Sequence, residues 1–171
     1  MDMRFDIAPI EGKYRGMERT VDIPWNPKTK KVYKQLLEKY YSHIELECNG
    51  DYDYESLEKM IAFYKELCTY GISCEMIAFS NEPLEQVHGY PIELLGIDIV
   101  HDMCESLIED EINPQIAHLL NDNGLCNTEA DVEKIIPFQD HGGVEWLPCY
   151  VYKILLGDIE VKKGGNTYDK Q

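Results

Sequence analysis

The sequence predicts an α/β fold, in which one domain holds a mixed sheet of about four or five strands with flanking helices. Three observations predict it. Some segments place apolar residues at helical spacing, and others alternate apolar with polar residues. The chain of 171 residues, 44% of them hydrophobic and 11% aromatic, is also long enough to bury a core. No internal repeat or linker divides it, so residues 1–171 are expected to form a single domain.

The N-terminal part is expected to begin with an irregular arm over residues 1–26. Prolines, glycines and charges are scattered there without periodicity, apart from a short strand expected at 20–23. A first helix is expected to begin at Pro27, because proline suits the first helical position. Its apolar residues recur at helical spacing and are Val32, Leu36, Leu37 and Tyr40.

A strand, a helix and a second strand follow. Residues 43–48 alternate apolar and polar side chains, as a half-buried strand does. Residues 56–70 carry an apolar stripe and are followed by Gly71, a typical helix stop. Residues 73–80 are more uniformly apolar, which predicts a buried strand. The unit has the length of a parallel strand pair joined by a right-handed crossover.

The second half of the chain contains two more strands and several short helices. A loop over 81–91 leads to a strand expected at 94–100. Two or three short helices are expected, around 103–109, 114–120 and 129–136. Thr128 has the position of an N-cap for the last of them. A closing strand is expected at 146–156, followed by a C-terminal tail over 158–171.

The six cysteines are widely spaced, lie mostly among apolar residues and form no C-x-x-C pair. They are expected to be buried free thiols rather than disulfides or zinc ligands. No glycine-rich phosphate loop is present, and neither a cofactor nor a metal is expected. The sequence has no secretory signal pattern and no apolar stretch of roughly 20 residues, which predicts a cytoplasmic protein.

Negative charge is concentrated in the middle of the chain. Residues 35–140 hold 23 Asp and Glu against 4 Lys and Arg, although the formal net charge of the whole chain is −16. Such a polyanionic region repels nucleic acid and anionic lipid and attracts basic molecules. The sequence therefore favours a basic protein as the partner, disfavours nucleic acid and membranes, and suggests a monomer or weak homodimer.

Two acidic clusters are the candidate partner-binding residues. The first lies on the predicted strand at 43–48 and in the loop after it, where carboxylates alternate with tyrosines, and the second follows the predicted strand at 94–100. Tyrosine rings supply contact area, and carboxylates pair with Lys and Arg. A merely solvated charged face is the alternative for each cluster. The candidates are Glu45, Glu47, Asp51, Tyr52, Asp53, Tyr54, Glu55, Glu105, Glu109, Asp110 and Glu111.

Short motifs within residues 90–156 resemble those of small bacterial immunity proteins of the polymorphic-toxin or contact-dependent-inhibition type. The similarity lies in a strand of the pattern L-G-apolar-D-apolar, a Ser-Leu pair, an Asn-Gly-Leu turn and a closing aromatic strand. The matching segments are 95–100, 106–107, 123–125 and 148–152.

Immunity proteins neutralise a toxin, usually a nuclease domain, and their acidity complements the basic cleft of that toxin. The resemblance therefore implies an inhibitor rather than an enzyme, one that binds and occludes a basic toxin domain. Because contact positions vary among such proteins, the resemblance assigns no toxin contact here. It implies instead that the motif residues Gly96, Asp98 and Ser106 serve the fold.

Two other functions remain open. In the first, the chain is an enzyme, and Asp98, His101 and either Asp140 or His141 meet in a pocket at strand ends, as open α/β sheets commonly arrange. In the second, the chain is an inhibitor that mimics nucleic acid, which requires carboxylates spaced like phosphates along an extended face. A cleft that gathers the Asp and His side chains would favour the enzyme.

Overall fold

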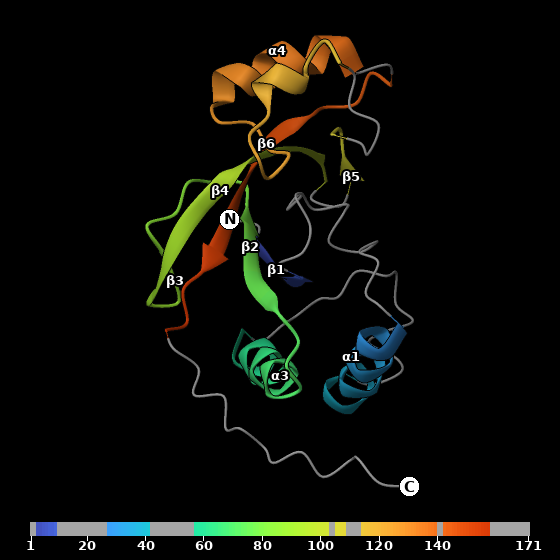
Figure 1. The fold of residues 1–171 in the computed structure, drawn as a ribbon. Helices are drawn as coiled ribbons and strands as arrows, with labels where there is room; N and C mark the ends of the chain where they lie inside the picture. The colour runs from blue at the N-terminus through green and yellow to red at the C-terminus, as the bar shows by residue number, and fades with distance from the viewer. Residues whose placement is uncertain are drawn as a thin grey trace, which may run out of the picture.

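The structure, a computed structural model, describes residues 3–9, 27–41, 57–102, 105–108, 114–139 and 142–157. A six-stranded antiparallel sheet forms its centre, in the order β1-β2-β6-β4-β3, with β5 also paired to β4. The strands are β1 (Met3–Pro9), β2 (Cys74–Ser80), β3 (Gln86–Val87), β4 (Tyr90–His101), β5 (Glu105–Ser106) and β6 (Leu147–Ile154). Although β6 is the last of these strands in sequence, it lies between β2 and β4 (Figure 1).

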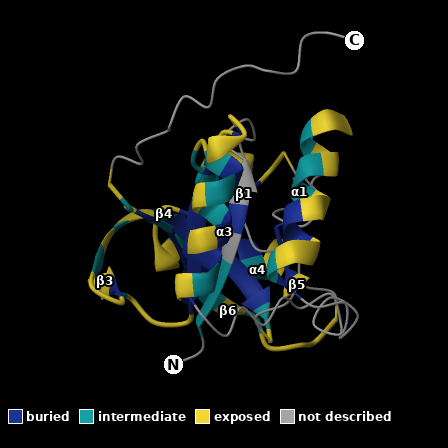
Figure 2. Ribbon diagram, turned by 90° about the horizontal axis from the view of Figure 1, so that it is seen from below, coloured by how far each residue is buried: buried dark blue, intermediate teal, exposed yellow. Residues whose placement is uncertain are grey.

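Two helices lie together at one end of the sheet and a third lies at the other end (Figure 1). They are α1 (Pro27–Tyr40), α3 (Leu57–Thr69) and α4 (Glu129–Gln139), and a single 3₁₀ turn, η1, spans Ala117–Leu119. Helix α3 packs on β2, α1 packs on α3, and α4 packs on β4. Figure 2 shows that α1 and α3 each bury one side and expose the other, as amphipathic helices do.

The α/β fold class and the three longer helices are confirmed. The helices predicted from Pro27 and over 56–70 are α1 and α3, and the one predicted over 129–136 is α4. Thr128 caps α4 as predicted, because its hydroxyl accepts a hydrogen bond of 3.2 Å from the backbone N–H of Asp131. In the part of the chain that the structure describes, no helix is both long and apolar enough to cross a membrane.

The strands predicted at 73–80, 94–100 and 146–156 are confirmed as β2, β4 and β6. Every pairing among the described strands is antiparallel. The predicted parallel pair requires residues 43–48, which lie outside the described residues, as does the short strand predicted at 20–23.

The N-terminal residues differ from the irregular arm that was predicted for them. Met3–Pro9 forms β1, which pairs with β2 along its whole length. Met3, Phe5 and Ile7 alternate with polar or small residues and lie on one face of the strand, where Ile7 is buried. This alternation is the signal for a strand, and the prolines and glycines further along the arm obscured it.

The prediction of a helix around 103–109 is wrong for residues 105–108, which the structure describes. Glu105 and Ser106 form the short strand β5 against β4. The apolar residues after it, Leu107 and Ile108, are buried in the core without a helix. Of the helix predicted over 114–120, only the 3₁₀ turn η1 forms.

The loop predicted over 81–91 contains a hairpin between β3 and β4. Its two turn residues, His88 and Gly89, have φ values of 48° and 84°. Positive φ at both positions is the geometry of a type I′ turn, which matches the twist of paired strands. The sequence obscured this hairpin because His88 lacks the usual preference for that conformation.

Four cysteines in the described part of the chain are free thiols, in agreement with the prediction. They are Cys68, Cys74, Cys126 and Cys149, and all but Cys68 are buried. Burial raises the pKa of the Cys126 thiol to about 12, and the nearby Asp98 carboxyl adds to the effect. Burial likewise raises the pKa of the Cys74 and Cys149 thiols, so these three buried thiols are held in the neutral form. Cys48 and Cys104 lie outside the described residues.

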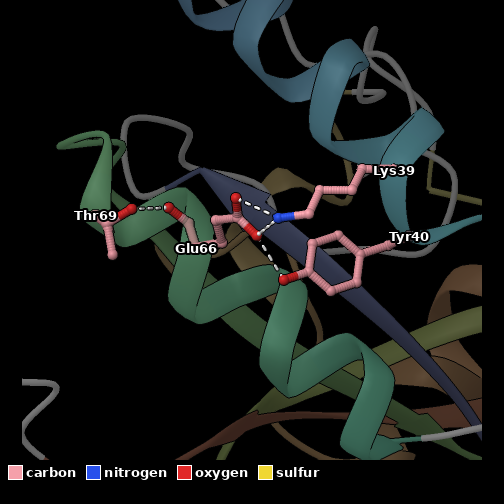
Figure 3. Close-up of polar contacts among 4 residues, drawn as sticks. All are labelled: Lys39, Tyr40, Glu66 and Thr69. Atoms are coloured by element: carbon pink, nitrogen blue, oxygen red, sulfur yellow. Dashed lines mark hydrogen bonds and ion pairs between the residues drawn. The ribbon is translucent and has the colours of Figure 1, made fainter.

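Helices α1 and α3 are joined by an aromatic contact and by a polar clamp of Lys39, Tyr40 and Glu66, which Figure 3 shows. The ring of Phe63 in α3 is fully buried against Tyr33 and Tyr40 of α1 and against Tyr41, which follows the helix. The Glu66 carboxylate of α3 accepts hydrogen bonds from Lys39 Nζ at 2.6 Å and from the Tyr40 hydroxyl at 2.6 Å.

We expect this clamp to contribute to stability only above acidic pH. The Lys39 and Tyr40 hydrogen bonds lower the pKa of the Glu66 carboxyl. A lowered folded-state pKa stabilises the protein above the unfolded value, and the contribution is lost as pH falls through the folded value. Glu66→Gln should therefore lower the free energy of unfolding by about 0.5–1 kcal/mol at pH 7, because the groups are partly exposed, and by less near pH 3.

Urea unfolding of the wild type and the variant at both pH values measures this difference. Glu38→Gln is the matched control, because it removes one exposed carboxylate of α1 that takes no part in the clamp. An equal loss of stability at both pH values in Glu66→Gln would contradict the assignment.

Candidate functional site

One of the predicted partner-binding residues, Glu105, lies in the described part of the chain, where it is exposed on β5. The others lie outside the described residues: Glu45, Glu47, Asp51, Tyr52, Asp53, Tyr54, Glu55, Glu109, Asp110 and Glu111. The site is therefore built here from the neighbours of Glu105.

Glu105 lies at the end of the sheet, in a row of three side chains. It pairs with His101 at the end of β4, and the ring of His101 contacts the ring of Trp146 with 6.0 Å between centroids. The His101 ring Nδ1 lies 3.2 Å from the backbone oxygen of Glu145. The carboxylate of Asp102 lies 3.2 Å from His101 Nε2. His101 thus contacts residues from the ends of β4 and β5 and from the segment before β6.

The contact between His101 and Asp102 was not expected from the sequence, since neighbouring residues of a strand point to opposite faces. The strand ends at this point, and Asp102 has a φ of 50°. This left-handed conformation turns the Asp102 carboxylate back toward the imidazole. Its side chain is 78% exposed, so the pair lies at the surface.

Apolar side chains are exposed beside these carboxylates. Leu147 is 49% exposed and Val144 is 38% exposed, on either side of the partly buried Trp146. Leu147 pairs with Val100, which pairs on its other edge with Ser106, so this second row points to the opposite face of the sheet from Glu105 and His101. We name Asp102, Glu105, Glu145 and Trp146 the Glu105 surface. Carboxylates around an aromatic ring suit the binding of a Lys or Arg side chain.

The larger surroundings of the Glu105 surface are also acidic. Residues 70–157 contain 16 acids and two bases, Lys134 and Lys153. Both bases are already ion-paired, Lys153 with Glu75 at 2.9 Å and Lys134 with Asp131 at 3.4 Å. In contrast, α1 has five lysines and one glutamate. The exposed carboxylates that the structure describes between 70 and 157 are Glu82, Glu85, Glu93, Asp102, Glu105, Asp122, Glu129, Glu133 and Glu145.

Asp98 and Ser106, two of the motif residues, are buried within the fold. The Asp98 carboxyl is fully buried and accepts hydrogen bonds from the Ser106 hydroxyl at 2.7 Å and from the Ile99 backbone N–H at 2.8 Å. The Ser106 hydroxyl also accepts one from the backbone N–H of Ile108 at 3.2 Å. These bonds fasten β5 and the residues after it to β4.

The Asn-Gly-Leu turn covers the same edge of β4. Asn121 donates a side-chain hydrogen bond to the backbone oxygen of Leu95 at 2.8 Å, and its own side-chain oxygen accepts one from the Asn123 N–H at 2.8 Å. The backbones of Ile97 and Cys126 exchange two hydrogen bonds of 2.9 Å. The motifs therefore protect a strand edge, which agrees with the expectation that they serve the fold.

The residues of the enzyme alternative do not converge where they are described. Asp98 is fully buried, whereas the His101 side chain is at the surface, and their spacing along β4 places them on opposite faces. Asp140 and His141 lie outside the described residues. No three His, Cys, Asp or Glu side chains gather as metal ligands within the described ranges.

Reasoning from the sequence missed Asp102, Glu145 and Trp146 as neighbours of Glu105. They come from two segments more than 35 residues apart, and the β4–β6 pairing brings them together. The available signal was the position of Asp102 two residues after a predicted strand, together with the charged Glu145 directly before another.

The fold and the surface define an α/β protein with an acidic end to its sheet. Comparisons with protein-family models, with curated proteins and with solved structures found no match to this chain.

Proposed function

We propose that the chain is an immunity protein, which binds a basic toxin domain through its acidic surface and occludes the cleft of that domain. The toxin would be a nuclease, because a nuclease cleft is lined with Lys and Arg that hold phosphates. The proposal takes the bacterial cytoplasm as the place where the two proteins meet. It extends the resemblance of the motifs in residues 90–156.

The uneven distribution of charge is the observation that carries this proposal. Nine carboxylates are exposed in the described part of residues 70–157, and both lysines of that segment are already paired with other acids. The negative electrostatic field of residues 70–157 is therefore not neutralised by the two lysines of that segment. A basic protein gains most from such a field.

In this mechanism, carboxylates of the chain would occupy the positions in the toxin cleft where the phosphates of its nucleic-acid substrate bind. Asp102, Glu105 and Glu145 would pair with basic side chains of the cleft, while Trp146 supplies the apolar contact that excludes water around them. The field would also accelerate association. Added salt shortens its reach to about 10 Å at 0.1 M, so the association rate should fall as salt is added.

The first test is co-purification of the tagged full chain from its native host at low salt, followed by elution with rising salt. A single stoichiometric basic polypeptide that is toxic when expressed alone, and harmless when expressed with this chain, is the expected result. Recovery of no protein, or of a small metabolite alone, would overturn the proposal.

The second test compares two charge reversals against the recovered partner. Glu105→Lys should weaken binding by at least about 10-fold, because it places a cation within the contact. Glu85→Lys makes the same change of net charge on an exposed residue before the β3–β4 hairpin, and it should alter only the salt-dependent association rate. Equal effects of the two variants on the dissociation rate would place the contact away from Glu105.

A further inference from the structure

One face of helix α1 is positively charged, in contrast with the acidic character of the chain. Four lysines in its first two turns are exposed, and we name them the α1 lysine face: Lys28, Lys30, Lys31 and Lys34. The lysine ion pairs in the described part of the chain involve Lys39, Lys134 and Lys153 instead. The α1 lysine face therefore presents its charge to solvent, although the chain has 32 acids against 16 bases.

The arrangement of these lysines lowers the stability of α1 itself. Lys31 lies three residues from both Lys28 and Lys34, so that like charges are neighbours on the helix surface. The positive end of the helix dipole lies at the same end of α1, and the first turn contains no acid that would offset it. A negatively charged partner that binds this face would relieve both effects.

The α1 lysine face and the Glu105 surface lie toward opposite ends of the sheet. Strand β6 pairs antiparallel with both β2 and β4, so β2 begins beside the end of β6, whereas β4 ends beside the start of β6. Helix α3 leads into the start of β2 and packs against α1, and β5, which carries Glu105, pairs with the end of β4 (Figure 1). The two surfaces of one copy are therefore apart, but a second copy can bring them together.

We propose that the chain associates with a second copy of itself, so that the α1 lysine face of one copy binds the Glu105 surface of the next. The lysine ammonium groups would pair with the carboxylates of Asp102, Glu105 and Glu145. The ring of Trp146 beside them can contact a lysine ammonium as well. The complementary charge of the two surfaces favours a second copy as the occupant. Because the contact joins two different surfaces, further copies can be added to it.

The net charge of −16 opposes this association at long range, because two acidic molecules repel each other. In physiological salt the field of exposed charges reaches only about 8 Å, so charges at the contact outweigh those on distant parts of the two copies. At low salt the repulsion extends further, and in about 1 M salt the contact itself is screened. Association should therefore be strongest at intermediate salt.

Sedimentation velocity of the full chain at rising protein concentration measures the association. In physiological salt the weight-average mass should rise at least about 1.5-fold above that of the monomer, by mass action. Lys31→Glu should abolish this rise, and it should fold, because an acid between Lys28 and Lys34 removes the repulsion within α1. Lys65→Glu is the matched control, since it makes the same change of net charge at an exposed lysine of α3, and it should associate as the wild type does.

A charge swap identifies the two surfaces in contact. Glu105→Lys alone should also be monomeric, and mixing it with Lys31→Glu should restore association, because the intact α1 lysine face of the first then meets the intact Glu105 surface of the second. A wild type that stays monomeric at every salt concentration, an equal loss in Lys65→Glu and Lys31→Glu, or a mixture that stays monomeric would contradict the proposal. The contact needs no toxin and does not rest on the proposed function, so its failure and that of the immunity proposal are distinguishable.

Discussion

Gly96→Ala should lower the free energy of unfolding by about 3–5 kcal/mol. A Cβ at Gly96 would lie 2.5 Å from the Cβ of Leu125 and 2.9 Å from the side-chain nitrogen of Asn121, much closer than van der Waals contact. The backbone there has a φ of +148°, which is strained for alanine. Strain and overpacking each contribute about 1–3 kcal/mol. The midpoint of urea unfolding, measured with the slope of the transition, reports the loss.

The neighbours of Gly96 explain why so large an effect is expected from one methyl group. The pairing of β4 with β6 shifts its register between Leu94 and Gly96, and the Asn121 turn packs against the bulge formed there. Gly142→Ala is the matched control, since no atom lies near its added Cβ and its φ is not positive. A change below about 0.5 kcal/mol in Gly96→Ala would show that the turn moves aside at little cost.

Ser106→Ala should lower the free energy of unfolding by about 2–3 kcal/mol. It removes the donor that binds the fully buried Asp98 carboxyl at 2.7 Å, and leaving a buried acceptor without its donor costs about 1–3 kcal/mol. Asp98→Ala should cost more, about 3–5 kcal/mol, because it also removes the acceptor for the Ile99 N–H and leaves a cavity.

A double-mutant cycle with Asp98→Asn and Ser106→Ala isolates the pair. The coupling energy should be about 1.5–3 kcal/mol if the two side chains act through each other. Ser73→Ala, at an exposed serine directly before β2, controls for the loss of a hydroxyl. A coupling energy near zero would mean that Asp98 is held by its other neighbours.

Much of the fold could be predicted because its signals are local. The apolar stripes of α1 and α3 and the stop at Gly71 predicted those helices to within about two residues, as expected for long periodic segments. The strand β5 could not be predicted in this way. Ser106 is extended because it binds Asp98 and pairs with Val100, and no pattern within residues 103–109 records those partners.

The candidate site was less predictable than the fold. The acidic character of the region and the exposure of Glu105 follow from composition. The placement of Trp146 beside His101 depends on the β4–β6 register, which composition does not record. Asp98, an acid at an alternating position of a strand, is instead fully buried, because Ser106 and the Ile99 N–H satisfy its oxygens.

The central position of β6 affects how the protein folds during synthesis. Its residues, Leu147–Ile154, fill the space between β2 and β4, so the sheet cannot close before residue 154 has been made. Until then one edge of β2 and one edge of β4 have unpaired backbone N–H and C=O groups, which can pair with other chains. We therefore expect the nascent chain to remain open to misassociation for longer than a sheet assembled from consecutive hairpins does.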